Sequence, residues 1–213
     1  FTANHQFKEG DVLHWWHEEL KFGTRTLFTD DYLWLIYVTY EYIKVTGDKS
    51  ILNEKVGFVE GNILPDGKDE MGISYTYSEE ETTLYDHLII TINKALNQFG
   101  VHGLPLMGSG DWNDGMNKIG HLGKGESVWV GVFLYDIIKR LLKILSTKDK
   151  ELKERLETVL PELEKNINNN AWDGSWYLRA FYDDGSPVGS INNEECKIDL
   201  ISQTWSILTD IAD

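Results

Sequence analysis

Residues 107–117 carry the side chains best suited to chemistry in this chain. They read Met-Gly-Ser-Gly-Asp-Trp-Asn-Asp-Gly-Met-Asn, so that Asp111 and Asp114 flank Trp112 among glycines. Glycine lets a backbone turn at positive φ and approach a ligand closely. An indole offers a flat apolar face with a polar edge, and a carboxyl group can protonate a glycosidic oxygen. The segment therefore indicates a carbohydrate site, although a turn rich in Asp and Asn with one aromatic plug is the competing interpretation.

The composition limits the kinds of partner. The chain has 213 residues, of which 41% are hydrophobic, enough for a sizeable core. Its formal net charge of −15 disfavours nucleic acid and anionic membranes, so we expect no nucleic-acid partner. The single cysteine fits a reducing compartment, and no apolar run is long enough for a membrane span. These features predict a soluble, cytoplasmic protein.

Several aromatic residues stand in polar surroundings. The chain contains 8 Trp and 10 Tyr, and the segment 14–17 reads His-Trp-Trp-His. Amphipathic rings with polar neighbours suit a half-hydrated ligand surface. Two histidines spaced by three can also bind a metal, but no convincing third ligand accompanies them, so we expect no metal.

Helical patterns account for most of the chain. One helix is predicted from an N-cap at residues 29–31 to Gly47, and a short helix at residues 51–56. Further helices are predicted at residues 80–99, 127–145 and 149–168, and from near Cys196 to the end. Residues 57–77 are expected to form a loop with a short extended piece at 73–77. Residues 175–189 are predicted to contain a hairpin that turns at residues 183–185.

The helices differ in polarity, which predicts their arrangement. Residues 127–145 are apolar on most sides and should be buried. Residues 149–168 are charged and should lie outside, with Pro161 kinking or splitting the helix. Alternating inner and outer helices predict an all-α fold, part of an (α/α)6 barrel with long loops and a small β-hairpin. These helices are too few to close such a ring, so the alternatives are a smaller bundle or a fragment.

Five segments resemble a known family. Residues 103–117, from Gly-Leu-Pro-Leu-Met to Gly-Met-Asn, resemble the catalytic signature of glycoside hydrolase family 94, the inverting disaccharide and oligosaccharide phosphorylases. Residues 9–17, 25–35, 172–177 and 193–199 match family motifs in the same order. The His-Trp-Trp-His segment and the downstream Glu-Glu-Cys-Lys-Ile-Asp are most similar to the branch acting on β-1,2-glucans.

The resemblance implies a reaction and a domain organisation. The reaction is inverting phosphorolysis of a β-linked glucan, β-1,2 in this branch, giving α-glucose 1-phosphate and a shortened glucan. Inorganic phosphate is a co-substrate, and no cofactor is implied. Residues 1–213 correspond to the central portion of the catalytic barrel, while the phosphate-holding elements of the family have no counterpart here. We therefore expect this chain alone to be inactive and to self-associate through open barrel edges.

The resemblance also assigns roles to individual residues. It makes Asp114 the general acid and places Trp112 beside the sugar at the cleaved bond. Asp111 is expected to accept backbone hydrogen bonds and shape the loop. The further substrate-binding candidates are Arg25, Asp31, His14, Trp15 and Trp16. For Arg25 the alternative is pairing with an acidic loop, and for Asp31 it is interaction with a helix dipole.

Two other kinds of protein remain open. An inverting hydrolase on the same scaffold needs a second carboxylate, roughly 6.5–9.5 Å from the first, to activate water. A phosphorylase needs no such base, because phosphate is already an anionic nucleophile. The remaining alternative is a non-catalytic carbohydrate-binding helical domain, which the aromatic content allows.

Overall fold

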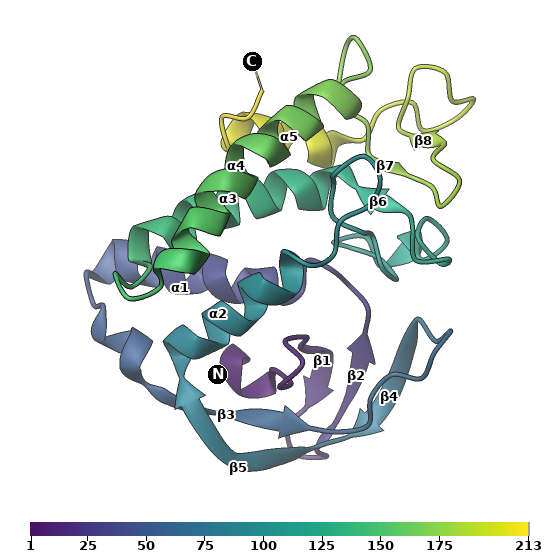
Figure 1. Ribbon diagram of the computed structural model, residues 1–213. Coiled ribbons are helices and arrows are strands. Elements are labelled where there is room, and N and C mark those ends of the chain that lie inside the picture. Colours follow the sequence, from purple (N-terminus) through teal and green to yellow (C-terminus); the bar gives the residue numbers. More distant parts are fainter. Residues whose placement is uncertain (213) are drawn as a thin grey trace. The chain divides into compact units, whose positions relative to one another are not determined.

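The structure is a computed structural model that describes residues 1–212 (Figure 1). The chain forms two compact units, the first comprising Phe1–Asn97 and the second beginning at Gln98. Across residues 1–212 there are five α-helices and eight strands, and the strands form three antiparallel sheets. The prediction of an all-α fold, part of an (α/α)6 barrel, is therefore wrong. None of the described helices is long and apolar enough to cross a membrane.

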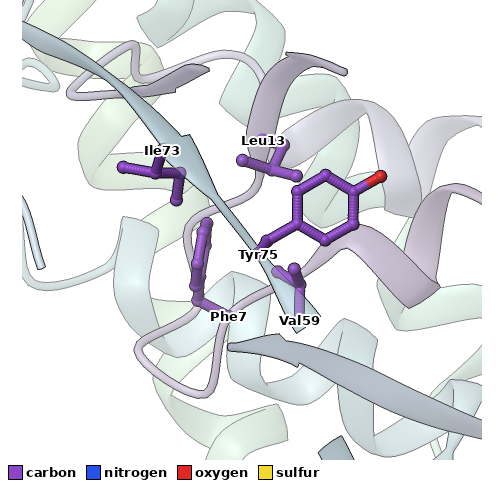
Figure 2. Close-up of a cluster of buried hydrophobic side chains, with 5 residues drawn as sticks. All are labelled: Phe7, Leu13, Val59, Ile73 and Tyr75. Carbon is purple, nitrogen blue, oxygen red and sulfur yellow. The ribbon is translucent and has the colours of Figure 1, made fainter. Parts of the chain in front are cut away.

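The first unit contains most of the unexpected strands. One sheet has the order β1–β2–β4, and β3 pairs with β5 in a second. The bounds are β1 Leu13–His17, β2 Phe22–Thr26, β3 Lys55–Glu60, β4 Glu70–Ser74 and β5 Thr76–Thr83; the helices are α1 Leu33–Thr46 and α2 Leu84–Ala95, with 3-10 turns at Thr2–His5 and Ser50–Asn53. Strand residues and the N-terminal segment share a hydrophobic cluster of Phe7, Leu13, Val59, Ile73 and Tyr75 (Figure 2).

The strand β5 occupies residues that were expected to form the first turn of a helix. Its polar sequence does not show the alternation that would predict a strand. Alternation of apolar and polar residues marks a strand only where one face is buried, and β5 exposes most of its side chains. The helix instead begins at Leu84, after a capping box. The Thr83 hydroxyl accepts a hydrogen bond from the Asp86 N–H at 3.1 Å, and the Asp86 carboxylate accepts one from the Thr83 N–H at 3.1 Å.

Helix α1 ends as predicted but begins differently. Gly47 closes it at φ 74°, and its N–H donates to the Ile43 carbonyl. The N-cap predicted at residues 29–31 is wrong, because the N-cap is Tyr32, whose side chain makes no capping hydrogen bond. The carboxylates of Asp30 and Asp31 are used elsewhere: the Trp34 indole N–H donates to Asp30 at 3.0 Å, and Asp31 faces a histidine described below.

The second unit contains α3 (Val128–Ile144), α4 (Lys150–Asn170) and α5 (Leu200–Leu208), with a small sheet of β6 (Glu126–Ser127), β7 (Ala180–Phe181) and β8 (Pro187–Val188). Helix α3 packs against both α4 and α5 (Figure 1). It is buried on most sides whereas α4 is largely exposed, which confirms the prediction from their polarity. Pro161 lies inside α4 without splitting it. The hairpin predicted within residues 175–189 is confirmed by the pairing of β7 with β8.

Candidate active site

In the loop from Asp111 to Gly115, side chains that hydrogen-bond to the loop backbone alternate with side chains that are exposed to solvent. The Asp111 carboxylate accepts a hydrogen bond from the Asn113 N–H at 3.2 Å, and the Asn113 side-chain oxygen accepts one from the Gly115 N–H at 3.0 Å. These are two consecutive Asx turns. The intervening side chains face outward: Trp112 is 64% exposed, and Asp114 is exposed at the start of a 3-10 turn. We call residues 111–115 the acid loop.

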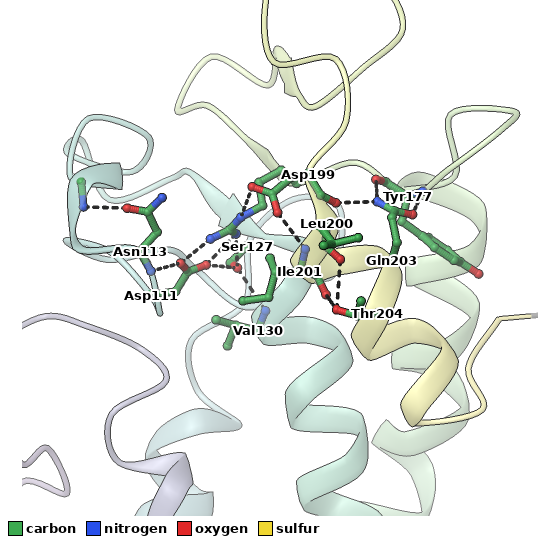
Figure 3. Close-up of polar contacts among 12 residues, drawn as sticks. Asp111, Asn113, Ser127, Val130, Tyr177, Asp199, Leu200, Ile201, Gln203 and Thr204 are labelled. Atoms are coloured by element: carbon green, nitrogen blue, oxygen red, sulfur yellow. Dashed lines mark hydrogen bonds and ion pairs between the residues drawn. The ribbon is translucent and has the colours of Figure 1, made fainter.

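A buried ion pair anchors the acid loop. Arg179 donates to both Asp111 oxygens, from Nη1 to Oδ2 at 2.7 Å and from Nη2 to Oδ1 at 2.5 Å. The Ser127 hydroxyl donates to Asp111 Oδ2 at 2.6 Å and accepts from the Val130 N–H, so it also caps α3 (Figure 3). Both members of the pair are almost fully buried. Bidentate arginine–carboxylate pairs are geometrically specific, so the position of Asp111 is well defined.

Arg179 is itself held in place by the backbone around it. Its N–H donates to the Val188 carbonyl at 2.7 Å, and its carbonyl accepts from the Val128 N–H at 3.2 Å. Its Nε lies 3.4 Å from an oxygen of Asp199, which caps α5 through the Ile201 N–H. Asp111, Ser127 and Asp199 meet in one polar region (Figure 3). The guanidinium of Arg179 therefore contacts the acid loop and the capping residues at the starts of α3 and α5.

A hollow of about 350 Å³ lies beside the acid loop. Its walls combine the exposed indole with polar groups from the loop and from the start of α5: they are Trp112, Asn113, Arg179, Asp199, Leu200, Ile201 and Thr204. An aromatic face opposite hydroxyl, amide and carboxylate groups is typical of a site for an amphipathic ligand such as a sugar ring.

A second carboxylate organises the segment that follows the acid loop. Asp183, in the hairpin turn, accepts hydrogen bonds from the N–H groups of Leu122, Lys124 and Gly125 at 2.8–2.9 Å. Burial alone would raise the pKa of Asp183, but these three donors and nearby His121 hold that pKa below its ordinary value. Asp183 is thus a structural anchor for residues 122–125.

In the first unit, the structure brings His14 and Asp31 together. His14 Nδ1 lies 3.0 Å from Asp31 Oδ2, and the Thr26 hydroxyl also donates to that oxygen, at 3.4 Å. Both side chains are partly accessible. The two residues are far apart in sequence and meet because β1 and the start of α1 converge, which the sequence does not show. Their roles in substrate binding remain predictions.

A β-bulge precedes the two tryptophans of the same strand. The pairing of β1 with β2 shifts by one residue between Leu13 and Trp15. This shift lets Leu13 and Trp16 share the buried face, where Trp16 packs against the hydrophobic cluster and stacks on His5 at 4.0 Å. Trp15 lies on the opposite face and is 44% exposed. Trp15 therefore offers a surface for a ligand, whereas the Trp16 ring is largely engaged in packing.

Arg25 is buried and already engaged by protein groups. It donates to both oxygens of Asp11, at 2.6 and 3.0 Å, to Glu9 at 3.1 Å and to the Asn62 carbonyl at 3.2 Å. Its guanidinium also lies over the Phe7 ring, 3.7 Å from the centroid. These contacts correspond to the alternative considered from the sequence, pairing with an acidic loop, and its contact with substrate remains a prediction.

Arg179 and Ser127 are functional residues that the motifs of the sequence do not indicate. Arg179 stands in Tyr-Leu-Arg-Ala-Phe, at residues 177–181, where a charge among apolar residues signals a buried partner. Its partner Asp111 is distant in sequence, so the pairing itself was not visible.

An exposed acid next to an exposed indole, beside a hollow with polar walls, is the arrangement expected of a carbohydrate-active site. The comparison with known families agrees: the catalytic domain of the glycosyl hydrolase 94 superfamily matches residues 1–213. The chain belongs to this family, which confirms the resemblance carried by its motifs.

Three similar proteins illustrate the range of relatives. The chain is 40% identical to the cyclic β-(1,2)-glucan synthase NdvB of Rhizobium meliloti over 98% of this chain and 7% of that protein. It is 37% identical to the 3-O-β-D-glucopyranosyl-β-D-glucuronide phosphorylase of Paenibacillus borealis, over 86% of this chain and 22% of the relative. It is 25% identical to the 1,2-β-oligoglucan phosphorylase of Listeria innocua, over 86% and 16%. The chain thus spans less than a quarter of the length of these curated relatives.

Proposed function

We propose that the complete protein is an inverting glycoside phosphorylase that cleaves a β-linked glucan, with β-1,2 linkages. The products are α-glucose 1-phosphate and a glucan shortened by one unit. Membership of the family supports the reaction type. The β-1,2 linkage is supported by the names of two relatives, a cyclic β-(1,2)-glucan synthase and a 1,2-β-oligoglucan phosphorylase.

The division of labour between the two acid-loop carboxylates carries the proposal. Both oxygens of Asp111 are engaged, by Arg179, Ser127 and the Asn113 N–H. Asp114 is presented to solvent beside Trp112. An inverting hydrolase requires one acid and one base, whereas a phosphorylase requires only the acid because phosphate is the nucleophile. A loop that commits one carboxylate to structure and presents the other fits the second requirement.

The proposed reaction balances with these groups. Asp114 donates its proton to the glycosidic oxygen as the bond from that oxygen to the anomeric carbon breaks. A phosphate oxygen attacks the anomeric carbon from the opposite face and inverts its configuration. Trp112 packs against the sugar ring beside the cleaved bond. Inorganic phosphate is the co-substrate in this scheme, and the glucan is the partner that the site recognises.

The reaction type is tested with the complete protein and β-linked glucobioses and glucotrioses of each linkage, with and without inorganic phosphate. We expect α-glucose 1-phosphate, phosphate-dependent cleavage, and a preference for β-1,2 linkages. Cleavage that proceeds equally without phosphate would identify a hydrolase. Glucan binding without turnover would identify a carbohydrate-binding module.

The acid is tested by Asp114→Asn. Loss of general acid catalysis should lower kcat by about 10² or more, with unchanged thermal stability because the side chain is exposed. The matched control is Asp184→Asn, at an exposed carboxylate in the hairpin turn, which should retain activity. Near-normal turnover by a folded Asp114→Asn variant would refute the assignment.

A further inference from the structure

We propose that Arg179 is a positioning residue for general acid catalysis: through Asp111 it fixes the direction in which the acid loop presents Asp114. The proposal rests on the proposed function, in which Asp114 is the acid. Arg179 also lines the hollow beside the loop, but the effect on the reaction assigned to it here passes through Asp111 and the loop.

The first step of the argument is the chain of hydrogen bonds from Arg179 to the loop backbone. The guanidinium holds both Asp111 oxygens. One of those oxygens also accepts from the Asn113 N–H, and Asn113 in turn accepts from the Gly115 N–H. The backbone directions at Trp112 and Asp114, which lie within these two turns, therefore follow from the position of Asp111.

The second step compares the backbone that leads into the loop with the backbone around Arg179. The loop follows Gly108 and Gly110, which both have positive φ, a region that glycine enters more readily than other residues. Arg179, in contrast, is fixed by hydrogen bonds of its own backbone to residues 188 and 128. Through its ion pair with Asp111, Arg179 links the acid loop to the small sheet and to the start of α3.

The third step is that arginine geometry is required. The planar guanidinium donates in parallel to two carboxylate oxygens, and a third nitrogen faces Asp199. A lysine ammonium at this position keeps the charge but loses the fork. Arg179→Lys therefore separates the geometry from the charge, and it is the informative substitution.

A purely structural ion pair and a positioning pair predict different kinetics. Loss of fold stability lowers the amount of active enzyme and affects all substrates equally. Loss of positioning affects the step that needs a proton at the leaving oxygen. A misplacement of about 1 Å can cost about 10² in rate, but a leaving group that departs as a stable anion does not need the proton.

The experiment compares two substrates in the complete protein with phosphate: a β-1,2-linked glucotriose, whose leaving group needs the acid, and 2,4-dinitrophenyl β-glucoside, whose leaving group does not. For Arg179→Lys we expect kcat on the glucotriose to fall by about 10- to 100-fold. On the dinitrophenyl glucoside we expect less than about a threefold change. Equal losses on both substrates, or no loss on either, would overturn the proposal.

Two controls separate this proposal from the proposed function. Asp114→Asn should show the same selectivity in stronger form; if it does not, the proposed function fails. Selective loss in Asp114→Asn, together with equal losses in Arg179→Lys, would overturn the positioning role alone. Arg140→Met removes the α3 ion pair of Arg140 with Asp136 and should leave the ratio of the two activities unchanged.

A second variant covers a failure to fold. Arg179→Met leaves Asp111 buried without its cation, whereas Arg179→Met with Asp111→Asn removes both charges and avoids that penalty. The folded double variant should keep the activity on the dinitrophenyl glucoside and lose activity on the glucotriose. Retention of both activities would show that the ion pair does not position the acid.

Discussion

Asp183 offers a sharp test of how the segment after the acid loop is held. Its side chain is 8% exposed and accepts three backbone hydrogen bonds, from Leu122, Lys124 and Gly125. The Gly125 carbonyl in turn accepts from the Met107 N–H at 2.7 Å, at the start of the segment that leads to the acid loop. Asp183→Ala removes all three acceptor contacts at once.

The magnitude follows from which donors water can reach. Leu122 and Lys124 are exposed, so water replaces much of their lost bonding, but Gly125 is buried. A hydrogen bond to a charged group contributes about 1.5–3 kcal/mol, and an unsatisfied buried donor carries its desolvation penalty. One full contribution and two partial ones predict a loss of about 3 kcal/mol for Asp183→Ala. Asp183→Asn keeps a neutral acceptor and should cost about half as much.

The pH dependence of stability tests independently whether the ionised Asp183 carboxylate stabilises the fold. The pKa of Asp183 is held below its ordinary value in the folded chain by its backbone donors and His121, although burial opposes this. The stabilisation is therefore fully present above the unfolded pKa, about 3.9, and is lost as the pH falls through the lower folded value. The difference in stability between the parent and Asp183→Ala should stay constant above about pH 5 and narrow below about pH 4.

Urea denaturation of the chain, followed by tryptophan fluorescence between pH 3 and pH 7, measures both quantities. The control is Asp184→Ala, at the neighbouring exposed carboxylate, with an expected cost below about 1 kcal/mol. A cost below about 1 kcal/mol for Asp183→Ala at pH 7, or a difference that widens on acidification, would refute this account of the turn.

Two further predictions concern packing and substrate binding. A Cβ at Gly100 would lie 2.4 Å from the side-chain carbons of buried Glu126, so Gly100→Ala should destabilise the chain by about 1–3 kcal/mol, as measured by urea denaturation. The control is Gly131→Ala, which should be tolerated because its Cβ would make only ordinary van der Waals contacts. Trp112→Ala should raise KM for the glucan about tenfold or more with little change in stability, because the ring is exposed. Steady-state kinetics against the control Trp172→Ala, at another exposed tryptophan, tests this, and an unchanged KM would remove Trp112 from the substrate site.

The second unit was predictable because its signals are local. The buried helix α3 and the exposed helix α4 differ in polarity along their whole length, and the Asp-Asp-Gly turn at residues 183–185 marks the hairpin. The first unit was not, because β5 carries Glu and Thr on a mostly exposed ribbon, and its strand character comes from pairing with β3. Pairing between distant segments leaves no periodic trace in such a sequence.

The candidate site shows the same limit at the level of single residues. The acid loop was recognisable because its carboxylates, indole and glycines are contiguous in sequence. The pairs Asp111–Arg179 and His14–Asp31 join separate segments and became visible only in three dimensions. For Asp111 the expectation that it accepts a backbone hydrogen bond is confirmed by its contact with the Asn113 N–H, but the cation beneath it was not anticipated.

The acid loop explains why a short motif can need both an Asp and an Asn that do no chemistry. Asp111 and Asn113 occupy the positions whose side chains turn back onto the N–H groups two residues later. The alternate positions, Trp112 and Asp114, are exposed to solvent. Two aspartates three residues apart thus have different tasks because one meets a buried arginine and the other meets solvent. The distinction between structural and catalytic carboxylate therefore depends on Arg179, 68 residues after Asp111, as much as on the motif itself.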